Sequence, residues 1–387
     1  MNLEDVQEMN RAVVIRLLRR SNSSSRAQIA RASGLKQATV SNIINDFLQR
    51  GIVKETGAMH GRKGRRCIGV SLNTEDFRVI GVRLERHYVR LALFDLTGRM
   101  EQGDDQALDP LADGESVMAT IVSSVQSMVD RAAGYRVLSA GIAIPGPYLS
   151  TEGRPAWVTE LPGFNSVPVK TRLSAALTIP VLIEHDAKAA ALAKWWSMVT
   201  HDDKQTIVYL TIGQGVGAGI VMEGNLLRGS CGTAGEIGHF TIDHNGPQCA
   251  CGNRGCLELY CSTIALLRAA RSVRGEDLAL GQVREAFLRG EPWATGVVEE
   301  SARHLGIGLV SVVNAYGAGR IIIGDEMSSF GERYLDVVKG AMSERTNPLI
   351  ARSLHIELDA SGRDEVLAGV GALAVGHALG QGLLRSG

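Results

Sequence analysis

Four residues between positions 239 and 256 combine the side chains that bind zinc. Cys249, Cys251 and Cys256 lie within eight positions of one another in a Gly-rich stretch, and His239 precedes Cys249 by ten positions. Three thiolates and one imidazole make a closed tetrahedral set, which is typical of a structural zinc site and leaves no place for an activated water. We therefore predict one structural Zn²⁺ and no catalysis at the metal. The alternative is a cluster of free cysteines.

A second group of residues suits the binding of an anion or a sugar. Gly213, Gly215 and Gly217 alternate after the predicted strand 207–210, and such glycines let the backbone approach a ligand and aim N–H groups at an anion. Asp186 ends the predicted strand 181–186, before an Ala-rich helix predicted over 187–196. A carboxylate there can accept a hydroxyl proton or bind a sugar hydroxyl. The alternative for Asp186 is an ordinary helix N-cap, and both roles can hold together.

The charges divide the chain of 387 residues into two parts. Lys and Arg together number 41, as do Asp and Glu, so the formal net charge is zero and at first argues against nucleic-acid binding. Residues 1–70, however, hold 13 basic and five acidic residues, a net charge of +8, and the remainder carries −8. This asymmetry indicates a basic nucleic-acid module joined to an acidic body.

The basic segment has the pattern of a DNA-reading domain. Helical spacing predicts helices over 6–20, 26–32 and 36–50, with Ser25 as a cap and a tight turn at 33–34. Helix, Gly-containing turn and helix form a helix-turn-helix, whose later helix enters the major groove. The predicted base and phosphate contacts in these helices are Arg26, Gln37, Ala38, Thr39, Ser41, Asn42 and Asn45.

Two β-prone runs, 52–56 and 65–72, follow the third helix and flank a basic tip. They resemble the wing of a winged helix-turn-helix, in which basic side chains meet phosphates or the minor groove. The predicted wing contacts are Arg62, Lys63, Arg65 and Arg66. The alternative for residues 1–70 is a small helical protein-interaction domain with solvated bases.

No segment is expected to cross a membrane. The first residues include acids and lack a basic stretch followed by an apolar one, so no signal peptide is predicted. Residues 366–384 carry no formal charge, but they are rich in Ala and Gly and lack flanking anchors, which favours a buried helix. Clustered cysteines in a chain of this size favour metal binding over disulfides, and hence a cytoplasmic protein.

Taken together, these motifs resemble the ROK family of repressors and sugar kinases over essentially the whole chain. The most specific stretches are 232–239 and 249–258, and the runs 145–147 and 161–164 are similar to the family's sugar-side loops. The resemblance implies an α/β fold: an N-terminal winged helix-turn-helix plus a two-lobed actin-like ATPase (RNase H-like) body. It also implies a sugar site formed by Asn165, His185, Asp186, Glu236, His239 and Glu258, with His239 shared between the metal and the sugar.

The chain departs from the family's kinases where they carry a D-x-G-x-T phosphate loop. Arg83 stands in place of the Asp, Glu85 and Arg86 replace the glycines, and His87 replaces the Thr. On the adenosine side, the Gly-Gly pair is altered to 324–325, and His185 replaces the usual Asn, as in the repressor branch. The resemblance thus implies a vestigial base at Asp186, a vestigial phosphate loop at 213–217 and no efficient use of ATP.

We therefore predict a transcriptional regulator, a repressor of sugar-uptake or sugar-catabolism genes that binds operator DNA as a homodimer or homotetramer. A sugar or sugar phosphate is the expected effector. The expected domains are 1–70 for DNA binding and 71–387 for the body, whose first lobe spans about 71–185 plus the C-terminal helix and whose second lobe spans about 186–364. Two alternatives stay open: an active ATP-dependent sugar kinase with an attached DNA-binding domain, and a repressor induced by a sugar-transport protein.

Overall fold

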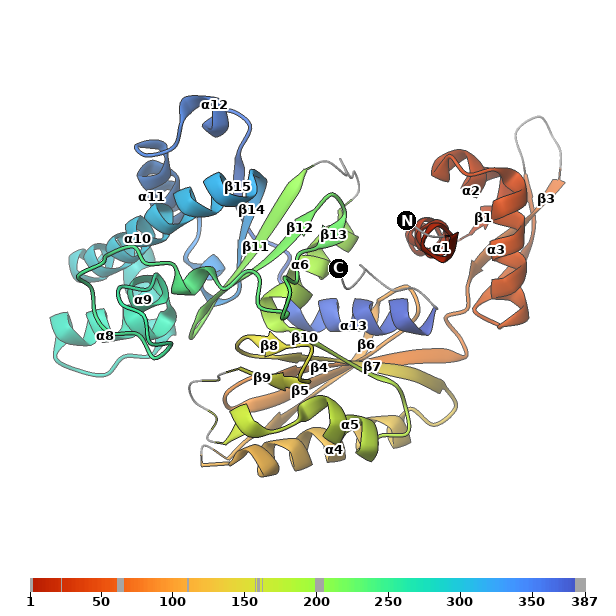
Figure 1. The fold of residues 1–387 in the computed structure, drawn as a ribbon, viewed down its shortest axis with the longest axis horizontal. Helices are drawn as coiled ribbons and strands as arrows, with labels where there is room; N and C mark the ends of the chain where they lie inside the picture. The colour runs from red at the N-terminus through yellow and green to blue at the C-terminus, as the bar shows by residue number, and fades with distance from the viewer. Residues whose placement is uncertain are drawn as a thin grey trace. The chain divides into compact units, whose positions relative to one another are not determined.

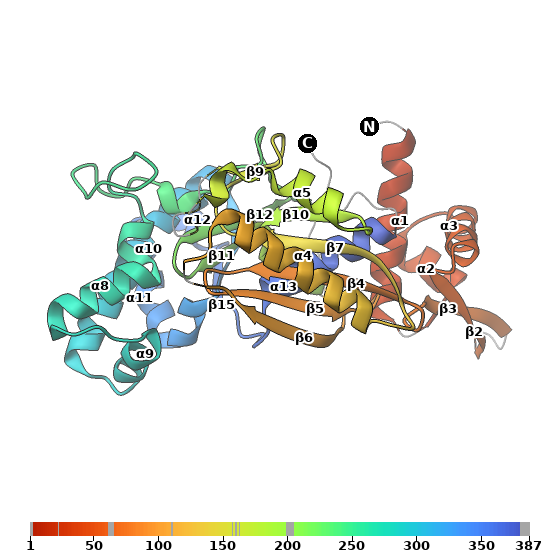
Figure 2. The same ribbon diagram turned by 90° about the horizontal axis from the view of Figure 1, so that it is seen from below.

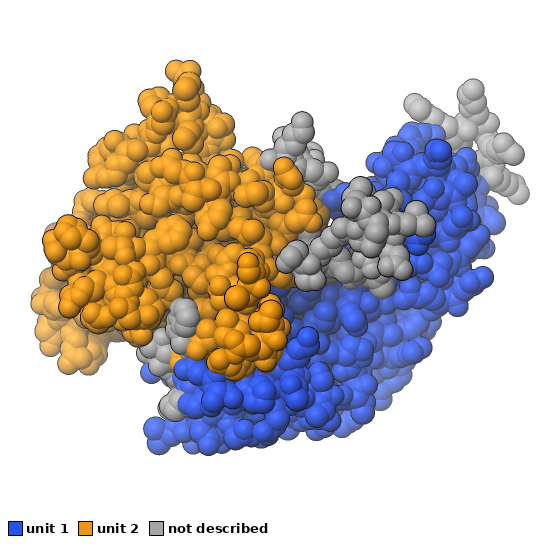
Figure 3. Space-filling model, in the orientation of Figure 1, with its two compact units in different colours: residues 1–144, 161–184, 367–385 blue, residues 145–160, 185–366, 386–387 orange. Residues whose placement is uncertain are grey.

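The computed structural model of the protein describes two compact units, each built from separate stretches of the chain (Figure 1). The described residues are 3–21, 23–60, 66–109, 111–156, 158, 161, 163–198 and 205–379. Unit 1 comprises residues 1–144, 161–184 and 367–385, and unit 2 comprises residues 145–160, 185–366 and 386–387, as coloured in Figure 3.

Unit 1 begins with three helices and a small sheet. The helices are α1 (Leu3–Arg20), α2 (Arg26–Ser33) and α3 (Gln37–Gln49), and the strands are β1 (Ser24–Ser25), β2 (Val53–His60) and β3 (Arg66–Leu72), in the order β1-β3-β2. The predicted cap is confirmed: Ser25 Oγ accepts from the Gln28 N–H, and Gln28 Oε1 accepts from the Ser25 N–H at 2.8 Å. Gly34 then ends α2 at φ +71°.

The apolar side chains of these helices form one small core. Val14, Ile15, Ile29, Ile44 and Phe47 are all 1% exposed or less. Strands β2 and β3 are antiparallel, with His60 opposite Arg66 at the end of the hairpin. The predicted wing contacts Arg62, Lys63 and Arg65 lie outside the described residues, as does the side chain of Arg66.

A five-stranded sheet follows in unit 1, in the order β10-β7-β4-β5-β6. Its strands are β4 (Phe77–Leu84), β5 (Tyr88–Phe94), β6 (Met100–Ala107), β7 (Arg136–Ile144) and β10 (Val181–His185). Strands β4, β5 and β6 are an antiparallel meander, and β7 runs parallel to β4. The central strands β4 and β7 are buried over most of their length because both of their faces are covered.

Helices pack on both faces of this sheet (Figures 1 and 2). On one face lies α4 (Gly114–Arg131), with α5 (Val169–Ala176) beside it. On the other lies α13 (Glu365–Ala378), where a Cβ on Gly141 would lie 2.1 Å from the Val370 carbonyl oxygen. Ser139 Oγ donates to the Ala374 carbonyl at 2.9 Å. The predicted closing helix is thus buried against the sheet over its described part.

Unit 2 contains a second five-stranded sheet, in the order β13-β12-β11-β14-β15. Its strands are β11 (Thr206–Ile212), β12 (Val216–Met222), β13 (Asn225–Leu226), β14 (Ala318–Gly324) and β15 (His355–Leu358). Strands β11, β12 and β13 form an antiparallel meander, while β14 runs parallel to β11 and β15 parallel to β14. A two-stranded sheet, β8 (Tyr148–Leu149) with β9 (Arg154–Pro155), completes the strands of this unit.

Helix α6 (Asp186–Ser197) covers one face of the second sheet through small side chains. The other face packs against a helical layer: α7 (Glu258–Cys261), α8 (Thr263–Arg274), α9 (Leu280–Leu288), α10 (Pro292–Tyr316), α11 (Glu332–Ser343) and α12 (Pro348–Ala351). Leu305 and Leu309 of α10 are fully buried in one core with Leu210 of β11. Within the described ranges, no helix is long and apolar enough to cross a membrane.

Candidate metal centre and ligand site

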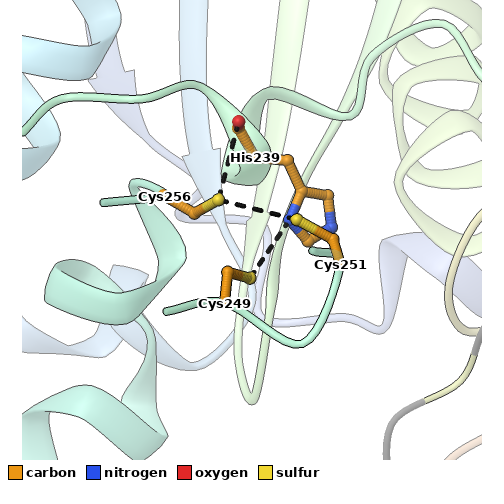
Figure 4. Close-up of side chains that lie close together, drawn as sticks. All are labelled: His239, Cys249, Cys251 and Cys256. Carbon is orange, nitrogen blue, oxygen red and sulfur yellow. Dashed lines mark hydrogen bonds between the residues drawn. The ribbon is translucent and has the colours of Figure 1, made fainter. Parts of the chain in front are cut away.

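The predicted metal ligands come together in unit 2 (Figure 4). His239 closes the 3-10 helix η3 (Ile237–His239), and the three cysteines lie on the loop before α7. One donor atom from each of the four residues lies within 4.8 Å of all the others. The Cys249 Sγ lies 3.7 Å from the His239 Nδ1, and the Cys251 Sγ lies 3.7 Å from the Cys256 Sγ.

These separations fit zinc. Zn–S bonds of about 2.3 Å in a tetrahedron place neighbouring sulfur atoms roughly 3.8 Å apart. Burial is the main reason that the pKa of the Cys249 thiol is raised, and the nearby Glu258 carboxylate adds to this effect. Burial likewise raises the pKa of Cys256 to about 11. A metal bound here would therefore have to displace thiol protons, so its affinity should fall as the pH falls.

Backbone hydrogen bonds shape the loop that carries the cysteines. The Cys249 N–H donates to the Asn253 carbonyl at 2.8 Å, and the Gly252 N–H donates back to the Cys249 carbonyl at 3.0 Å. Gly252 has φ +93°, a conformation that other residues adopt only with strain. This turn brings Cys249 and Cys251 to one side, so the four donors would hold a Zn²⁺ that cross-links η3 to the loop.

Five of the six predicted sugar ligands lie in unit 2, beside this centre. The Glu258 Oε1 is 3.4 Å from the His239 Nδ1 and 3.2 Å from the Cys249 Sγ. The His185 Nε2 is 3.0 Å from the Asp186 Oδ1. Glu236 is close enough to Asp186 and Glu258 that their charges raise its pKa. Asn165, the sixth, is a half-buried residue of the 3-10 helix η2 (Phe164–Ser166) in unit 1.

The N-cap interpretation of Asp186 was wrong. His185 is the residue that precedes the helix in extended conformation, and Asp186 is the first residue of α6. Its Oδ1 contacts the N–H of the next residue, Ala187. The half-buried Asp186 carboxylate therefore lies at the start of the helix, beside His185.

Sequence reasoning missed Lys188, which the structure buries completely. Its Nζ donates to the Gly232 carbonyl at 2.7 Å, which ties α6 to the loop that leads into Glu236. Burial raises the pKa of Glu236 to about 7, against the opposing effect of Lys188, while Asp186 and Glu258 raise it further. A lysine in an Ala-rich helix would ordinarily be expected to face water, so nothing in the sequence marked it.

Two of the three glycines of the predicted phosphate loop lie in the turn between β11 and β12. Gly213 and Gly215 lie in the turn, where the Gly213 N–H donates to the Gly215 carbonyl at 3.1 Å. Gly217 lies within β12, where a Cβ would be 3.2 Å from the His185 Cε1. A Cβ on Gly215 would be 3.6 Å from the Glu258 Oε2. The glycines thus keep backbone close to the predicted sugar ligands.

The corresponding turn in unit 1 has different chemistry. The Glu85 N–H donates to the Tyr88 carbonyl at 2.8 Å, so Arg86 and His87 form the tip of a tight hairpin between β4 and β5. Glu85 lies 3.6 Å from Arg83 and 3.5 Å from Arg90, measured between charged atoms. Charged side chains therefore occupy the turn that the resemblance assigns to phosphate binding.

In unit 1, most of the predicted DNA contacts of the N-terminal helices lie on one accessible face of α3. Gln37, Ala38, Asn42 and Asn45 are exposed, while Thr39 and Ser41 are half-buried. Arg26 is half-buried at the start of α2, and its guanidinium donates to the Asn45 Oδ1 at 3.2 Å. The same guanidinium lies 3.8 Å from the Glu55 carboxylate. Arg26 therefore links α2, α3 and β2.

Comparison with known proteins shows that this chain belongs to the ROK family. The family profile described as "ROK family" matches residues 79–377. The chain is 28% identical to the "Putative xylose repressor" of Caldicellulosiruptor sp. (strain Rt8B.4) over 375 residues, which cover 92% of both chains. It is also 28% identical to the "DNA-binding transcriptional dual regulator NagC" of Escherichia coli (strain K12) over 378 residues, covering 92% of this chain and 91% of that one.

Two solved structures show how far the fold similarity extends. The first is a "ROK family transcriptional regulator, homolog of E.coli MLC protein", with a TM-score of 0.82 and 24% identity over 97% of this chain and 98% of that one. The second is the "ROK Hexokinase from Thermus thermophilus", with a TM-score of 0.63 and 28% identity over 76% of this chain and 97% of that one. The regulator thus matches nearly the full chain, and the kinase matches about three quarters of it.

Proposed function

Since this chain belongs to the ROK family, we propose that it is a DNA-binding transcriptional regulator, a repressor of sugar-uptake or sugar-catabolism genes. Residues 1–70 are its winged helix-turn-helix, and residues 71–387 are the body that receives the signal. The observation that carries this function is the exposed polar face of α3, which follows the Gly34 turn and precedes the β2–β3 hairpin. The repressor relatives, aligned over 92% of the chain, support it.

The face of α3 suits a major groove. Short side chains such as Gln37, Ser41 and Asn42 can approach base edges closely, and amides bind adenine with two hydrogen bonds. The basic residues of the wing, Arg62 and Arg65 among them, would contact phosphates, which position the protein without reading sequence. A symmetric dimer would place two copies of α3 in successive major grooves of a palindromic operator.

The effector in this proposal is a sugar or sugar phosphate, bound by the carboxylates and imidazoles that surround the metal centre. Glu236, Glu258 and Asp186 offer hydroxyl acceptors within one cluster of unit 2. A Zn²⁺ held by His239 and the cysteines would have a structural role and fix the orientation of the His239 ring. Sugar binding would act through different affinities for the DNA-competent and DNA-incompetent forms, typically about 1–3 kcal/mol of coupling.

A test begins with the full-length, zinc-loaded protein and a pool of random-sequence duplexes. We expect selection to enrich one palindromic sequence, and fluorescence anisotropy to give an affinity that falls steeply with salt. The double variant Arg62→Ala, Arg65→Ala should weaken binding to all duplexes and reduce the salt slope by about 1.8. Gln37→Ala should instead change the preferred sequence. Failure to enrich any sequence would remove the proposal.

The second candidate function is an active sugar kinase, favoured by the similarity to the hexokinase body. The Glu85 carboxylate in the first turn of unit 1 counts against it, because a carboxylate beside a triphosphate is repulsive. An assay of ATP-dependent phosphorylation over a panel of hexoses decides between the two. Turnover that Asp186→Asn abolishes would favour the kinase, and no turnover would favour the repressor.

A further inference from the structure

Asp325 has a backbone conformation that is ordinarily reserved for glycine. It follows Gly324 at the end of β14 and has φ +61° and ψ −152°. A non-glycine residue in this region is strained and persists only when its surroundings hold it. Among the described residues other than glycine, Glu223, at φ 50°, is the only other one with a positive φ. The strained position belongs to the 324–325 pair, where the sequence departs from the Gly-Gly of the family's kinases.

The structure on both sides of Asp325 holds this conformation. After it, the N–H and Oγ of Ser328 both donate to the Asp325 carbonyl, at 3.1 and 2.7 Å. Before it, Gly324 packs directly against the hydroxyl of Tyr209, which leaves no room for a Cβ. That hydroxyl donates to Asp359 at 2.7 Å, and the Asp359 N–H donates to the Ile323 carbonyl at 2.8 Å. The chain is fixed at each end of the strained residue.

The result is that carboxylates lie against the glycine turn of unit 2. A Cβ on Gly213 would be 3.2 Å from the Asp325 Oδ2 and 3.5 Å from the Glu326 Oε2. Gly213 and Gly215 give the β11–β12 turn the open backbone that a phosphate group could approach. Two carboxylate side chains occupy part of that space and repel an anion that enters it.

We propose that Asp325, with Glu326, is the determinant that keeps nucleoside triphosphates off the β11–β12 turn of unit 2. The glycine turn is retained because it also approaches the sugar-ligand cluster, where Gly215 faces Glu258. Exclusion of phosphate is achieved instead by a residue that directly follows the neighbouring strand β14. This inference rests on the proposed function in that it explains why a body related to sugar kinases responds to a sugar without consuming a nucleotide.

The test measures binding, not turnover, with the full-length, zinc-loaded protein. Isothermal titration uses Mg²⁺ with the non-hydrolysable analogue AMPPNP, and a second series uses inorganic tripolyphosphate. Asp325→Gly removes both the carboxylate and the strain, and Asp325→Asn removes the charge alone. Glu223→Gly is the matched control, because it also relieves a positive φ but lies in the turn between β12 and β13.

We expect wild-type protein and Glu223→Gly to bind AMPPNP weakly and alike. Asp325→Gly should bind it at least tenfold more tightly, with Asp325→Asn in between, and tripolyphosphate should follow the same order. Equal affinity of wild type and Asp325→Gly would overturn the inference, whether both bind or neither does. The proposed function would instead be overturned if wild type bound no operator sequence, or if wild type phosphorylated a hexose. The two failures are therefore distinguishable.

Discussion

The two five-stranded sheets share one strand order, but the turn of the first hairpin is charged in unit 1 and rich in glycine in unit 2. In each unit, an antiparallel meander of three strands is extended on the other side of its first strand by two more. The first hairpin of unit 1 turns at Arg86 and His87 beside the charged Glu85. The first hairpin of unit 2 turns at Gly213–Gly215.

The strand order that the sheets share depends on helix packing, whereas the hairpin turns that differ lie outside the helix–sheet contacts. In unit 1, Gly81 and Gly141 lie directly beneath the backbone of α13. In unit 2, Gly219 lies directly beneath the Ala187 carbonyl of α6. A helix can approach each sheet this closely only where the strand lacks a Cβ. The turns bear no such constraint, so their residues could change while the strand order stayed the same, and the two units acquired different chemistry.

The largest expected effect concerns the metal loop. Within the described part of the chain, the cluster suited to a metal lies in unit 2. Cys251→Ser should lower the zinc content from about one ion per chain to nearly none, because a closed four-ligand site loses most of its affinity without one thiolate. Plasma mass spectrometry measures the metal content, and hydrogen exchange should show lost protection around residues 239–258 only.

The control is Cys231→Ser, which changes an exposed thiol outside the cluster. It should leave metal content and exchange unaltered. If Cys251→Ser also abolished protection in β4 and β7, the two units would not be independent and the comparison between them would fail.

The second effect compares two buried hydrogen bonds, each of which joins a helix to the rest of its unit. Lys188→Met in unit 2 removes the donor to the Gly232 carbonyl and leaves Glu236 without its neighbouring cation. Breaking such a buried charge pair costs about 3–5 kcal/mol. Ser139→Ala in unit 1 removes only a neutral hydrogen bond to the Ala374 carbonyl, worth about 1 kcal/mol. Urea unfolding at pH 8 should rank the variants in this order.

The pH dependence of the Lys188→Met effect follows from Glu236. Its pKa is raised from the model-compound value of 4.5 to about 7 in the folded protein, so folding binds a proton and stability falls as the pH rises between these values. Without Lys188 the folded pKa should rise further and extend the loss to higher pH. The gap between wild type and variant should therefore be smaller at pH 5 than at pH 8. If the two proteins differed by the same unfolding free energy at pH 5 and pH 8, the pairing of Lys188 with Glu236 would be contradicted.

The sequence predicted what depends on local spacing. Ser25 and Gly34 marked the ends of α2, and the positions of His239 and the three cysteines marked a metal cluster that the fold brings within 4.8 Å. The burial of Lys188 and the strained conformation of Asp325 were not predicted, because they depend on partners at Gly232 and Gly213, far away along the chain. Packing across a sheet, not periodicity, decides whether such a lysine is buried or such an aspartate strained.

The third effect tests whether the glycines beneath the helices are equivalent. A Cβ on Gly141 would lie 2.1 Å from the Val370 carbonyl oxygen, and one on Gly219 would lie 2.2 Å from that of Ala187. Because backbone must move in both cases, Gly141→Ala and Gly219→Ala should each cost about 1–3 kcal/mol. Gly103→Ala, on the exposed strand β6, meets only an ordinary contact at 3.8 Å and should be neutral or slightly stabilising.

Thermal unfolding measures all three glycine variants. Similar losses for Gly141→Ala and Gly219→Ala would sharpen the view that one packing rule builds both sheets. A loss in only one unit would show that the shared strand order hides different helix–sheet contacts.

The smallest effect is expected at the charged turn of unit 1. Glu85→Gln removes the ion pairs with Arg83 and Arg90, at 3.6 and 3.5 Å, and its side chain is 31% exposed. Ion pairs that water reaches contribute only about 0.2–1 kcal/mol, so the urea midpoint should barely move. That result would mean that the pairing of the strands stabilises the hairpin without help from the Glu85 ion pairs, so the residues of the turn can vary. A loss above roughly 2 kcal/mol, beyond what such pairs supply, would mean instead that the charges stabilise the hairpin, and the turns would then differ in structural role as well as in chemistry.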